Sequence, residues 1–355
     1  MLQKDLNTRR DKILGLIIDS HVNTAEPIAS RAISKKLRMG LSPATVRNVM
    51  SDLEEQELIT HPHTSAGRVP TEKGYRYYID RLMRASLLTE GEKKSIDKEF
   101  KVRLSELNSL LDRTSNILSL ITNQTGLVLF PVLQKSFFKH VEIVKLDNND
   151  ILIVLLTASG VTKDFVVELK ENIPETELSR ISNFINKYMG KGSLDDIKKD
   201  ISQRLITERD AFFYILEKAK AIIDIMLDII KENKMYLNGR SHITEQPEFG
   251  DIDKLKNLLR HLEDKDFMFS LLKKMIDKEG TNIYIGSELG SDFSECSLIT
   301  SNYCIGDTSC GTLGIIGPIR MEYSRLTSIV DYVAQKLSGV LGSQQKTKLR
   351  TRSRI

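Results

Sequence analysis

The chain has 355 residues, of which 40% are hydrophobic and 28% are charged, and its formal net charge is +4. This composition excludes disordered and fibrous proteins, and at about 150 residues per domain the length indicates two or three globular domains. The longest purely apolar run, Ile151–Leu156, is far shorter than the roughly 18 residues of a membrane helix, and the charged N-terminus predicts no secretory signal.

Charge is unevenly distributed along the chain. The first 86 residues carry more basic than acidic side chains, and residues 346–355 carry five basic side chains and no acidic ones. The segment between them is therefore net acidic. This pattern predicts a polyanion-binding module joined to a remainder that does not bind polyanions.

The first eighty residues are predicted to form short helices separated by turns. Ser42-Pro43 is a strong signal for a helix start, because Ser caps free backbone N–H groups and Pro at the first helical position has no N–H to lose. A loop rich in Gly, Pro, Ser and Thr follows between two short strands. The expected helices cover 7–21, a short segment from Ser30, 43–56 and 71–82, and the expected strands begin at Leu58 and Val69.

Beyond residue 88 one or two helices are expected up to residue 124. After them, apolar residues recur at every second position, which is typical of β-strands. The expected strands cover 127–132, 137–146, 151–159, 161–168, 282–285, 297–303 and 312–316, with a further candidate at 235–243. The expected helices cover 174–189, 194–234, 252–262, 267–278 and 323–341. This order of strands, helices and strands predicts an α+β domain interrupted by a mostly helical insertion at about 190–265.

The order of the N-terminal elements is typical of a winged helix-turn-helix, whose third helix enters the major groove of DNA. Val46, Val49, Met50 and Leu53 would point inward, which leaves five outward candidates for base contacts: Ser42, Thr45, Arg47, Asn48 and Ser51. Arginine can bridge the two acceptors of guanine, and asparagine can pair with adenine. Arg68 in the wing could enter a minor groove or meet a phosphate, and the other phosphate candidates are Arg9, Arg10, Arg31, Lys35 and Arg76. A generic helical surface is the alternative.

Other residues suggest chemistry less strongly. His61 and His63 lack partners at metal-ligand spacing, so contacts of the wing with DNA or plain loop positions are preferred. Cys296, Cys304 and Cys310 are odd in number and lack C-x-x-C spacing, which argues against a disulfide framework and a zinc site. Buried apolar cysteines in a reducing cytoplasm are expected, with redox sensing as the alternative. The glycines at 311, 314 and 317 suit a strand better than a phosphate loop, so we expect no cofactor, no metal and no enzymatic activity.

Several segments resemble the heat-inducible transcription repressor HrcA family of bacteria. They are Glu26-Pro27-Ile28-Ala29-Ser30-Arg31, the helix 41–54, the wing 61–71, Gly74-Tyr75-Arg76-Tyr77-Tyr78-Ile79-Asp80, and 311–318 with Met321, Tyr323 and Asp331-Tyr332. The resemblance implies a homodimeric repressor that binds an inverted-repeat operator on double-stranded DNA upstream of chaperone genes. It also implies that the GroE chaperonin maintains the active form, in the bacterial cytoplasm at the nucleoid.

The resemblance also implies a division into domains. A winged helix-turn-helix would occupy 1–87, a linker helix and the first part of a GAF-like domain 88–190, an inserted dimerisation domain 191–265, and the second part of the GAF-like domain 266–342. The basic tail 343–355 is expected to be disordered. The apolar stripe from Ile215 to Ile230 is either a dimer seam or a core within one domain. Two other functions stay open: control by a small ligand in the GAF-like domain, and a helical interaction protein without a role on DNA.

Overall fold

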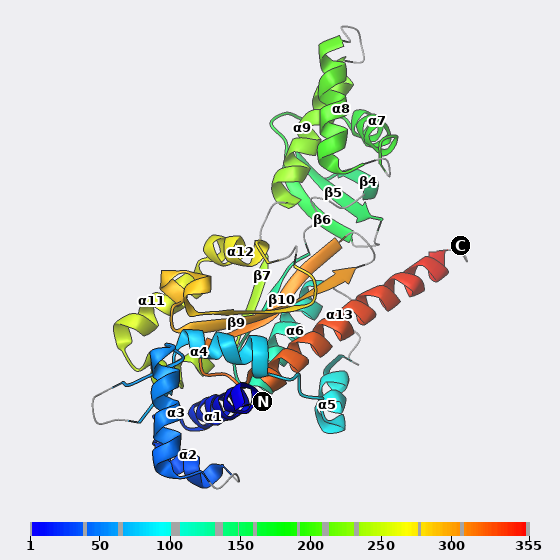
Figure 1. The fold of residues 1–355 in the computed structure, drawn as a ribbon. Helices are drawn as coiled ribbons and strands as arrows, with labels where there is room; N and C mark the ends of the chain where they lie inside the picture. The colour runs from blue at the N-terminus through cyan, green and yellow to red at the C-terminus, as the bar shows by residue number, and fades with distance from the viewer. Residues whose placement is uncertain are drawn as a thin grey trace. The chain divides into compact units, whose positions relative to one another are not determined.

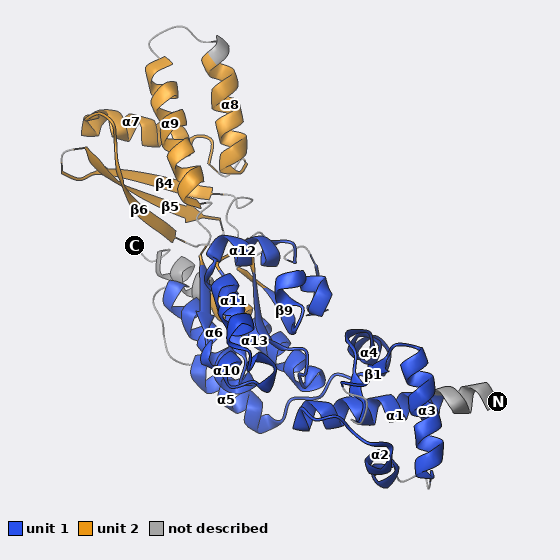
Figure 2. Ribbon diagram, turned by 90° about the vertical axis from the view of Figure 1, so that its left-hand side faces the viewer, with its two compact units in different colours: residues 1–129, 235–302, 312–336 blue, residues 130–234, 303–311, 337–355 orange. Residues whose placement is uncertain are grey.

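The computed structural model describes residues 2–37, 41–62, 67–100, 107–131, 138–147, 149–158, 162–189, 192–207, 213–230, 234–275, 278–305 and 309–352 (Figure 1). The chain has an α+β fold with two compact units. Unit 1 comprises residues 1–129, 235–302 and 312–336, and unit 2 comprises residues 130–234, 303–311 and 337–355 (Figure 2).

The N-terminal module, residues 2–82, belongs to unit 1 and consists of helices and one small hairpin. Helices α1 (Leu2–Thr24), α2 (Ser30–Lys36) and α3 (Pro43–Glu55) pack on one another, with Ile17, Ile33 and Val46 fully buried. Strands β1 (Ile59–Thr60) and β2 (Val69–Pro70) pair antiparallel. Helix α4 (Glu72–Tyr77) then continues into a π-helical turn, Tyr78–Leu82.

A five-stranded central sheet forms the rest of unit 1. Its strand order is β7-β3-β10-β9-β8, and the pairs β10–β3, β3–β7 and β8–β9 are antiparallel. The strands are β3 (Thr125–Leu129), β7 (Met235–Asn238), β8 (Thr281–Ile285), β9 (Cys296–Ile305) and β10 (Ser309–Pro318). The helices are α5 (Glu90–Phe100), α6 (Leu107–Thr122), α10 (Ser241–Thr244), α11 (Ile252–Glu263), α12 (Lys265–Lys273) and α13 (Tyr323–Arg352). Alternate residues of β3 face opposite layers, so Leu127 and Leu129 share one core with Leu262 and Met268.

Unit 2 contains a three-stranded antiparallel sheet in the order β4-β5-β6, covered on one face by helices. The elements are β4 (Phe138–Lys145), β5 (Asp150–Thr157), β6 (Thr162–Glu168), α7 (Glu175–Asn186), α8 (Leu194–Thr207) and α9 (Phe213–Ile230). In β5, Ile151, Ile153 and Leu155 are buried in the core beneath the helices, whereas the residues between them are only partly buried. The alternation is that of a sheet with one covered face.

The insertion differs from the one expected at 191–265. The second compact unit is formed mainly by residues 130–234, so strands β4, β5 and β6 pack with α7, α8 and α9 instead of joining the central sheet. Helices α10, α11 and α12 belong to unit 1. A period of two identifies a strand but does not specify which sheet the strand joins, which is why the expected boundary was misplaced.

The helices correct the predicted disorder of the tail and decide between the two interpretations of the apolar stripe. The prediction of a disordered tail is wrong for residues 343–352, because α13 continues as a helix through Arg352. This segment has no proline and is rich in Gln, Lys and Arg, which favour helices. The apolar stripe on α9 is the core of unit 2 itself, since Leu216, Ile223 and Met226 are buried within the single chain. These residues are therefore not available as a dimer seam.

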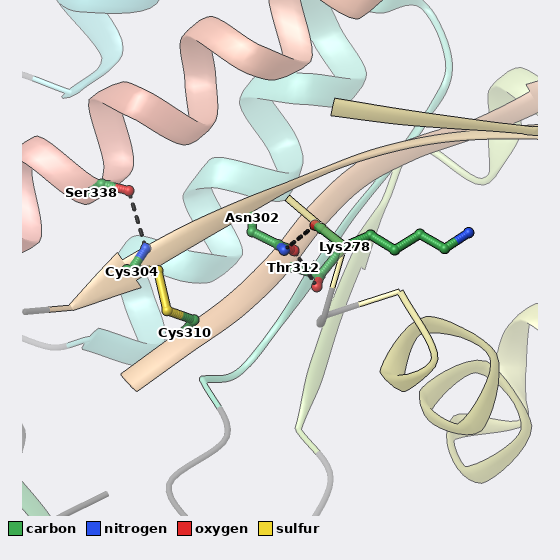
Figure 3. The surroundings of a disulfide bond; sticks show 6 residues. All are labelled: Lys278, Asn302, Cys304, Cys310, Thr312 and Ser338. Atoms are coloured by element: carbon green, nitrogen blue, oxygen red, sulfur yellow. Dashed lines mark hydrogen bonds between the residues drawn. A yellow bond between two sulfur atoms is a disulfide. The ribbon is translucent and has the colours of Figure 1, made fainter. Parts of the chain in front are cut away.

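The cysteine prediction is also corrected. Cys304 and Cys310 form a disulfide across β9 and β10, with 4.1 Å between their Cα atoms (Figure 3). Neighbouring strands of one sheet bring these residues opposite each other, an arrangement that neither the cysteine count nor C-x-x-C spacing can reveal. The backbone N–H of Cys304 donates to Ser338 Oγ of α13 at 3.1 Å. Cys296 is the buried free cysteine, and burial raises the pKa of its thiol to about 12.

Candidate nucleic-acid interface

The outer face of α3 presents a row of polar side chains. Val46, Met50 and Leu53 are buried, and their spacing of four and three residues places them on one side of the helix. The five residues predicted to face outward are all exposed: Ser42, Thr45, Arg47, Asn48 and Ser51. The predicted division of this helix into an inner and an outer face is therefore confirmed for these residues, whereas Val49, also expected to point inward, is only partly buried.

The start of α3 is fixed by a side-chain cap. Ser42 Oγ accepts a hydrogen bond from the backbone N–H of Thr45 at 3.1 Å and lies 2.9 Å from Thr45 Oγ1. These two hydroxyls thus hold the first turn of the helix. Within the described part of the chain, the side chains of Arg47, Asn48 and Ser51 have no hydrogen-bond or ion-pair partner, so their polar groups are free to bind an external ligand.

Exposed basic residues lie on the other helices of the module. Arg9 on α1 and both Arg31 and Lys35 on α2 are exposed, as a phosphate contact requires. Arg10 differs, because its guanidinium donates to Gln56 Oε1 at 3.1 Å and to the Tyr77 hydroxyl at 2.9 Å. Arg10 therefore ties the first helix to the end of α3 and to α4, and its side chain is largely committed within the module.

Arg76 is engaged in contacts with the central sheet. Its guanidinium donates to the backbone carbonyl of Ile283 in β8 at 2.9 Å and pairs with Glu288. The expectation that Arg76 meets a phosphate is therefore corrected: this arginine attaches the N-terminal module to the central sheet.

Arg68 also lies in contacts within the module. Its guanidinium pairs with Glu54 at the end of α3, with 2.8 Å between Nη2 and Oε2, and its Nη1 lies 2.5 Å from His61 Nδ1. His61 Nε2 in turn lies 3.1 Å from Glu54 Oε1. His63, the remaining candidate of the wing, lies outside the described residues.

A polar cluster, which sequence reasoning missed, joins α1 to the far end of the chain. Arg320 follows β10, and its guanidinium donates to Glu248 Oε1 at 2.5 Å, to the backbone carbonyl of Val22 at 2.8 Å and to Gln246 Oε1 at 3.1 Å. Only 14% of its side chain is exposed. The partners are separated by 72 to 298 positions, so no local pattern could have indicated them.

Two aromatic residues extend this cluster. His21 Nδ1 lies 2.7 Å from the Tyr75 hydroxyl, and the Tyr75 ring centroid lies 6.0 Å from that of Tyr323. Burial, and secondarily the charge of Arg320, lowers the pKa of His21. The neutral imidazole is therefore the form that accepts the Tyr75 hydroxyl proton in its hydrogen bond. Burial likewise raises the pKa of Tyr75 far above its ordinary value, so this hydroxyl stays a donor.

Other sites offer little for ligand chemistry. A cavity of about 440 Å³ lies against α11, and its lining includes the ion pair between Lys254 and Glu295, so the one lysine of the lining is already paired. Within the described ranges, no three His, Cys, Asp or Glu side chains are grouped so as to hold a metal ion. Of the helices in those ranges, none has both the length and the apolar character needed to span a membrane.

Comparisons with known proteins lead to one family, HrcA. Residues 108–327 match the family described as HrcA protein C terminal domain. The chain is 35% identical to a heat-inducible transcription repressor HrcA of Pelotomaculum thermopropionicum, over 95% of this chain and 97% of that protein. It is 36% identical to the protein of the same name from Geobacter sulfurreducens, over 95% and 98%. A crystal structure of a hypothetical protein shares the fold with a TM-score of 0.56 and 19% identity, and covers 94% of this chain and 98% of that one.

Proposed function

This chain belongs to the HrcA family of heat-inducible transcription repressors, and from that premise we propose that its N-terminal module is a winged helix-turn-helix that binds an inverted-repeat operator upstream of chaperone genes. The observation that carries the proposal is the outer face of α3, where Arg47, Asn48 and Ser51 are exposed and unpaired among the described residues. Capped at Ser42 and anchored by its buried face, α3 is a rigid support for these side chains.

In this proposal the module divides its contacts between bases and phosphates. Arg47 bridges the two acceptors of a guanine, and Asn48 pairs with an adenine, both in the major groove. Arg9, Arg31 and Lys35 contact phosphates and fix the register without reading sequence. The segment between β1 and β2 is the wing. The hydrogen-bonding groups on the base edges supply the specificity, and no cofactor takes part.

The test is a comparison of affinities by fluorescence anisotropy. The full-length chain is titrated onto a duplex carrying an inverted repeat from a chaperone promoter and onto a scrambled duplex of the same composition. Arg47→Ala and Asn48→Ala should each cost about 1–3 kcal/mol on the operator and reduce the preference over the scrambled duplex. Arg180→Ala, which removes the same charge from an exposed site on α7, should leave both affinities unchanged. Equal affinity of the unaltered chain for both duplexes would refute sequence-specific binding.

We propose further that the repressor acts as a homodimer, since an inverted repeat is read by two modules related by a two-fold axis. Unit 2 supports this with the uncovered face of its sheet, where Val144, Leu152 and Val166 lie side by side in register. Val166 is 59% exposed and Val144 41% exposed, which is unusual for neighbouring apolar residues on one face. A second copy of this face is the occupant we propose.

Sedimentation velocity tests the dimer. Val166→Glu places a charge in the centre of the proposed interface and should shift the chain from dimer to monomer. Ile252→Glu alters an apolar residue on α11 that is even more exposed, outside this face, and should leave the dimer intact. A monomeric unaltered chain, or a Val166→Glu variant that remains dimeric, would contradict the proposed interface.

The family resemblance supports two finer proposals. The central sheet with its helices is a GAF-like domain, and the GroE chaperonin maintains the repressor in its active form in the bacterial cytoplasm, at the nucleoid. Operator binding is measured at a heat-shock temperature with and without purified chaperonin and ATP. Binding should decay without chaperonin and persist with it; undiminished binding without chaperonin would refute maintenance for this chain.

A further inference from the structure

We propose that Arg68 is a positioning residue: through Glu54 and His61 it ties the residue that follows β1 and the residue that precedes β2 to the end of α3, and it does not itself bind DNA. The inference rests on the proposed function, because it concerns how operator binding is organised. It reverses the expectation from the sequence that Arg68 enters a minor groove or meets a phosphate.

The first support is the closed geometry of the three side chains. Glu54 Oε2 accepts from Arg68 Nη2 at 2.8 Å and from Nε at 3.1 Å, while Glu54 Oε1 lies 3.1 Å from His61 Nε2. Arg68 Nη1 lies 2.5 Å from His61 Nδ1 and completes the ring of contacts. The cluster joins the last turn of α3 to both ends of the wing, since His61 follows β1 and Arg68 precedes β2.

The second support is the charge of this cluster. The guanidinium of Arg68 donates two hydrogen bonds to the Glu54 carboxylate, so its positive charge is balanced by a negative charge within the module. The pair of arginine and carboxylate carries no net charge and therefore attracts a phosphate less strongly than a free arginine does.

The third support is the backbone around Arg68. Its N–H donates to the carbonyl of Ile28, and the N–H of Ile28 donates to the Arg68 carbonyl, both at 2.9 Å. At Gly67, a Cβ atom would lie 2.6 Å from the Ile28 backbone, so only glycine permits this close approach. Arg68 is thus fixed through its backbone to the segment between α1 and α2, and through its side chain to α3.

These contacts make it costly for Arg68 to reach DNA. The side chain would have to abandon two charge-assisted hydrogen bonds to Glu54 and the bond to His61, and it is only 18% exposed. What Arg68 contributes instead is a fixed connection between α3 and the residues at the two ends of the wing, His61 and Arg68. Binding energy from both elements can add only if they meet the same duplex together.

The experiment measures operator affinity as a function of salt concentration. Each neutralised phosphate contributes about 0.9 to the slope of log K against log salt concentration. Residues 61–67 contain no lysine or arginine, so a misplaced wing loses no other basic contact. Arg68→Gln should therefore weaken operator binding about tenfold or more with an unchanged slope. A slope reduced by about 0.9 would identify a direct phosphate contact and overturn the inference.

Glu54→Gln provides a second test, because the two roles of Arg68 predict changes of operator affinity in opposite directions. Glu55→Gln is the matched control. Both variants remove one negative charge from the last turn of α3, but Glu55 is exposed and lies outside the cluster. If Arg68 positions the wing, Glu54→Gln should bind the operator more weakly than Glu55→Gln. If Arg68 binds DNA, Glu54→Gln releases it, and this variant should bind more tightly, which would also overturn the inference.

The outcomes separate this inference from the proposed function. An unaltered chain that does not prefer the operator refutes the proposed function whatever the variants do. An unaltered chain that prefers the operator, with a Glu54→Gln variant equal to or tighter than Glu55→Gln, refutes only the positioning role. Should Arg68→Gln fail to fold by circular dichroism, the comparison of the two glutamate variants decides the question alone.

Discussion

Replacing Arg320 with alanine should loosen the attachment of α1 to the central sheet. The substitution removes a guanidinium that holds three partners from two distant segments: the Val22 carbonyl, and Gln246 with Glu248. It also leaves the Glu248 carboxylate without its cation. The conservative variant Arg320→Lys keeps the charge but loses the two-point contact with Glu248, so its effect should be intermediate.

The expected loss is about 2–3 kcal/mol. Breaking a fully buried ion pair by removing one partner costs about 3–5 kcal/mol, because the remaining charge stays buried without a counter-charge or water. Here the side chain of Glu248 is 25% exposed and can recover water, which lowers the cost. The loss of the hydrogen bond to the Val22 carbonyl adds about 1.5 kcal/mol or more, because its donor is charged.

Amide hydrogen exchange followed by mass spectrometry measures this loss locally. A change of 2–3 kcal/mol corresponds to opening that is about 30- to 150-fold more populated, confined to α1 and the residues around Gln246. Amides of α9 in unit 2 serve as the internal control and should exchange at an unchanged rate. Unaltered protection of α1 in Arg320→Ala would show that the cluster does not hold this helix.

The same cluster predicts a dependence of stability on pH. The pKa of His21 is lowered by burial and by Arg320, so the folded state favours the neutral imidazole. This contribution to stability is fully present above the ordinary histidine value of 6.5 and is lost as the pH falls below it toward the folded pKa. In Arg320→Ala the His21 pKa, measured by NMR, should rise. In His21→Gln the stability loss between neutral and mildly acidic pH should become smaller; an unchanged pH profile would contradict the assignment.

The remaining predictions concern packing and cysteine chemistry. Gly74→Ala should destabilise the N-terminal module by about 1–3 kcal/mol or more in thermal unfolding, because its Cβ would lie 2.0 Å from the Leu58 carbonyl oxygen. Gly15→Ala, with nothing within 4 Å in α1, should instead stabilise it by about 0.5–1 kcal/mol, and a loss would contradict this. Met226→Ala should cost unit 2 about 2–5 kcal/mol in denaturant unfolding, since this side chain is fully buried; a cost below 1 kcal/mol would oppose that reasoning. Cys296 should resist alkylation at pH 8 until the chain is unfolded, and modification of the native chain would disprove its burial.

Sequence reasoning was most successful where the determinants of structure are local. The cap of Ser42, the proline that follows it and the apolar spacing of Val46, Met50 and Leu53 lie within twelve consecutive residues. These features determine both where α3 begins and which side chains face outward. The residues offered for base contacts could therefore be chosen correctly as exposed without knowledge of any tertiary contact.

The charged residues were predicted less well, because their roles depend on distant partners. Arg10, Arg68 and Arg76 carry the same side chain as Arg47, yet each is occupied by groups from other segments of the fold. A count of basic residues cannot distinguish an arginine that is free from one that is paired. Only the tertiary structure separates the cations that can meet DNA from those that hold the module together.

The insertion of unit 2 leaves the ends of the central strands close to each other. Leu129 at the end of β3 is in register with Met235 at the start of β7, and the backbone N–H of Phe130 donates to the Lys234 carbonyl at 2.8 Å. The end of β3 and the start of β7 therefore pair as the two strands of a hairpin do. A tight turn of a few residues can replace the residues between them. Residues 130–234, the main part of unit 2, are in this sense removable as one piece: a shortened gene that joins Leu129 to Met235 through such a turn encodes an uninterrupted central sheet, and another domain can be inserted at the same position.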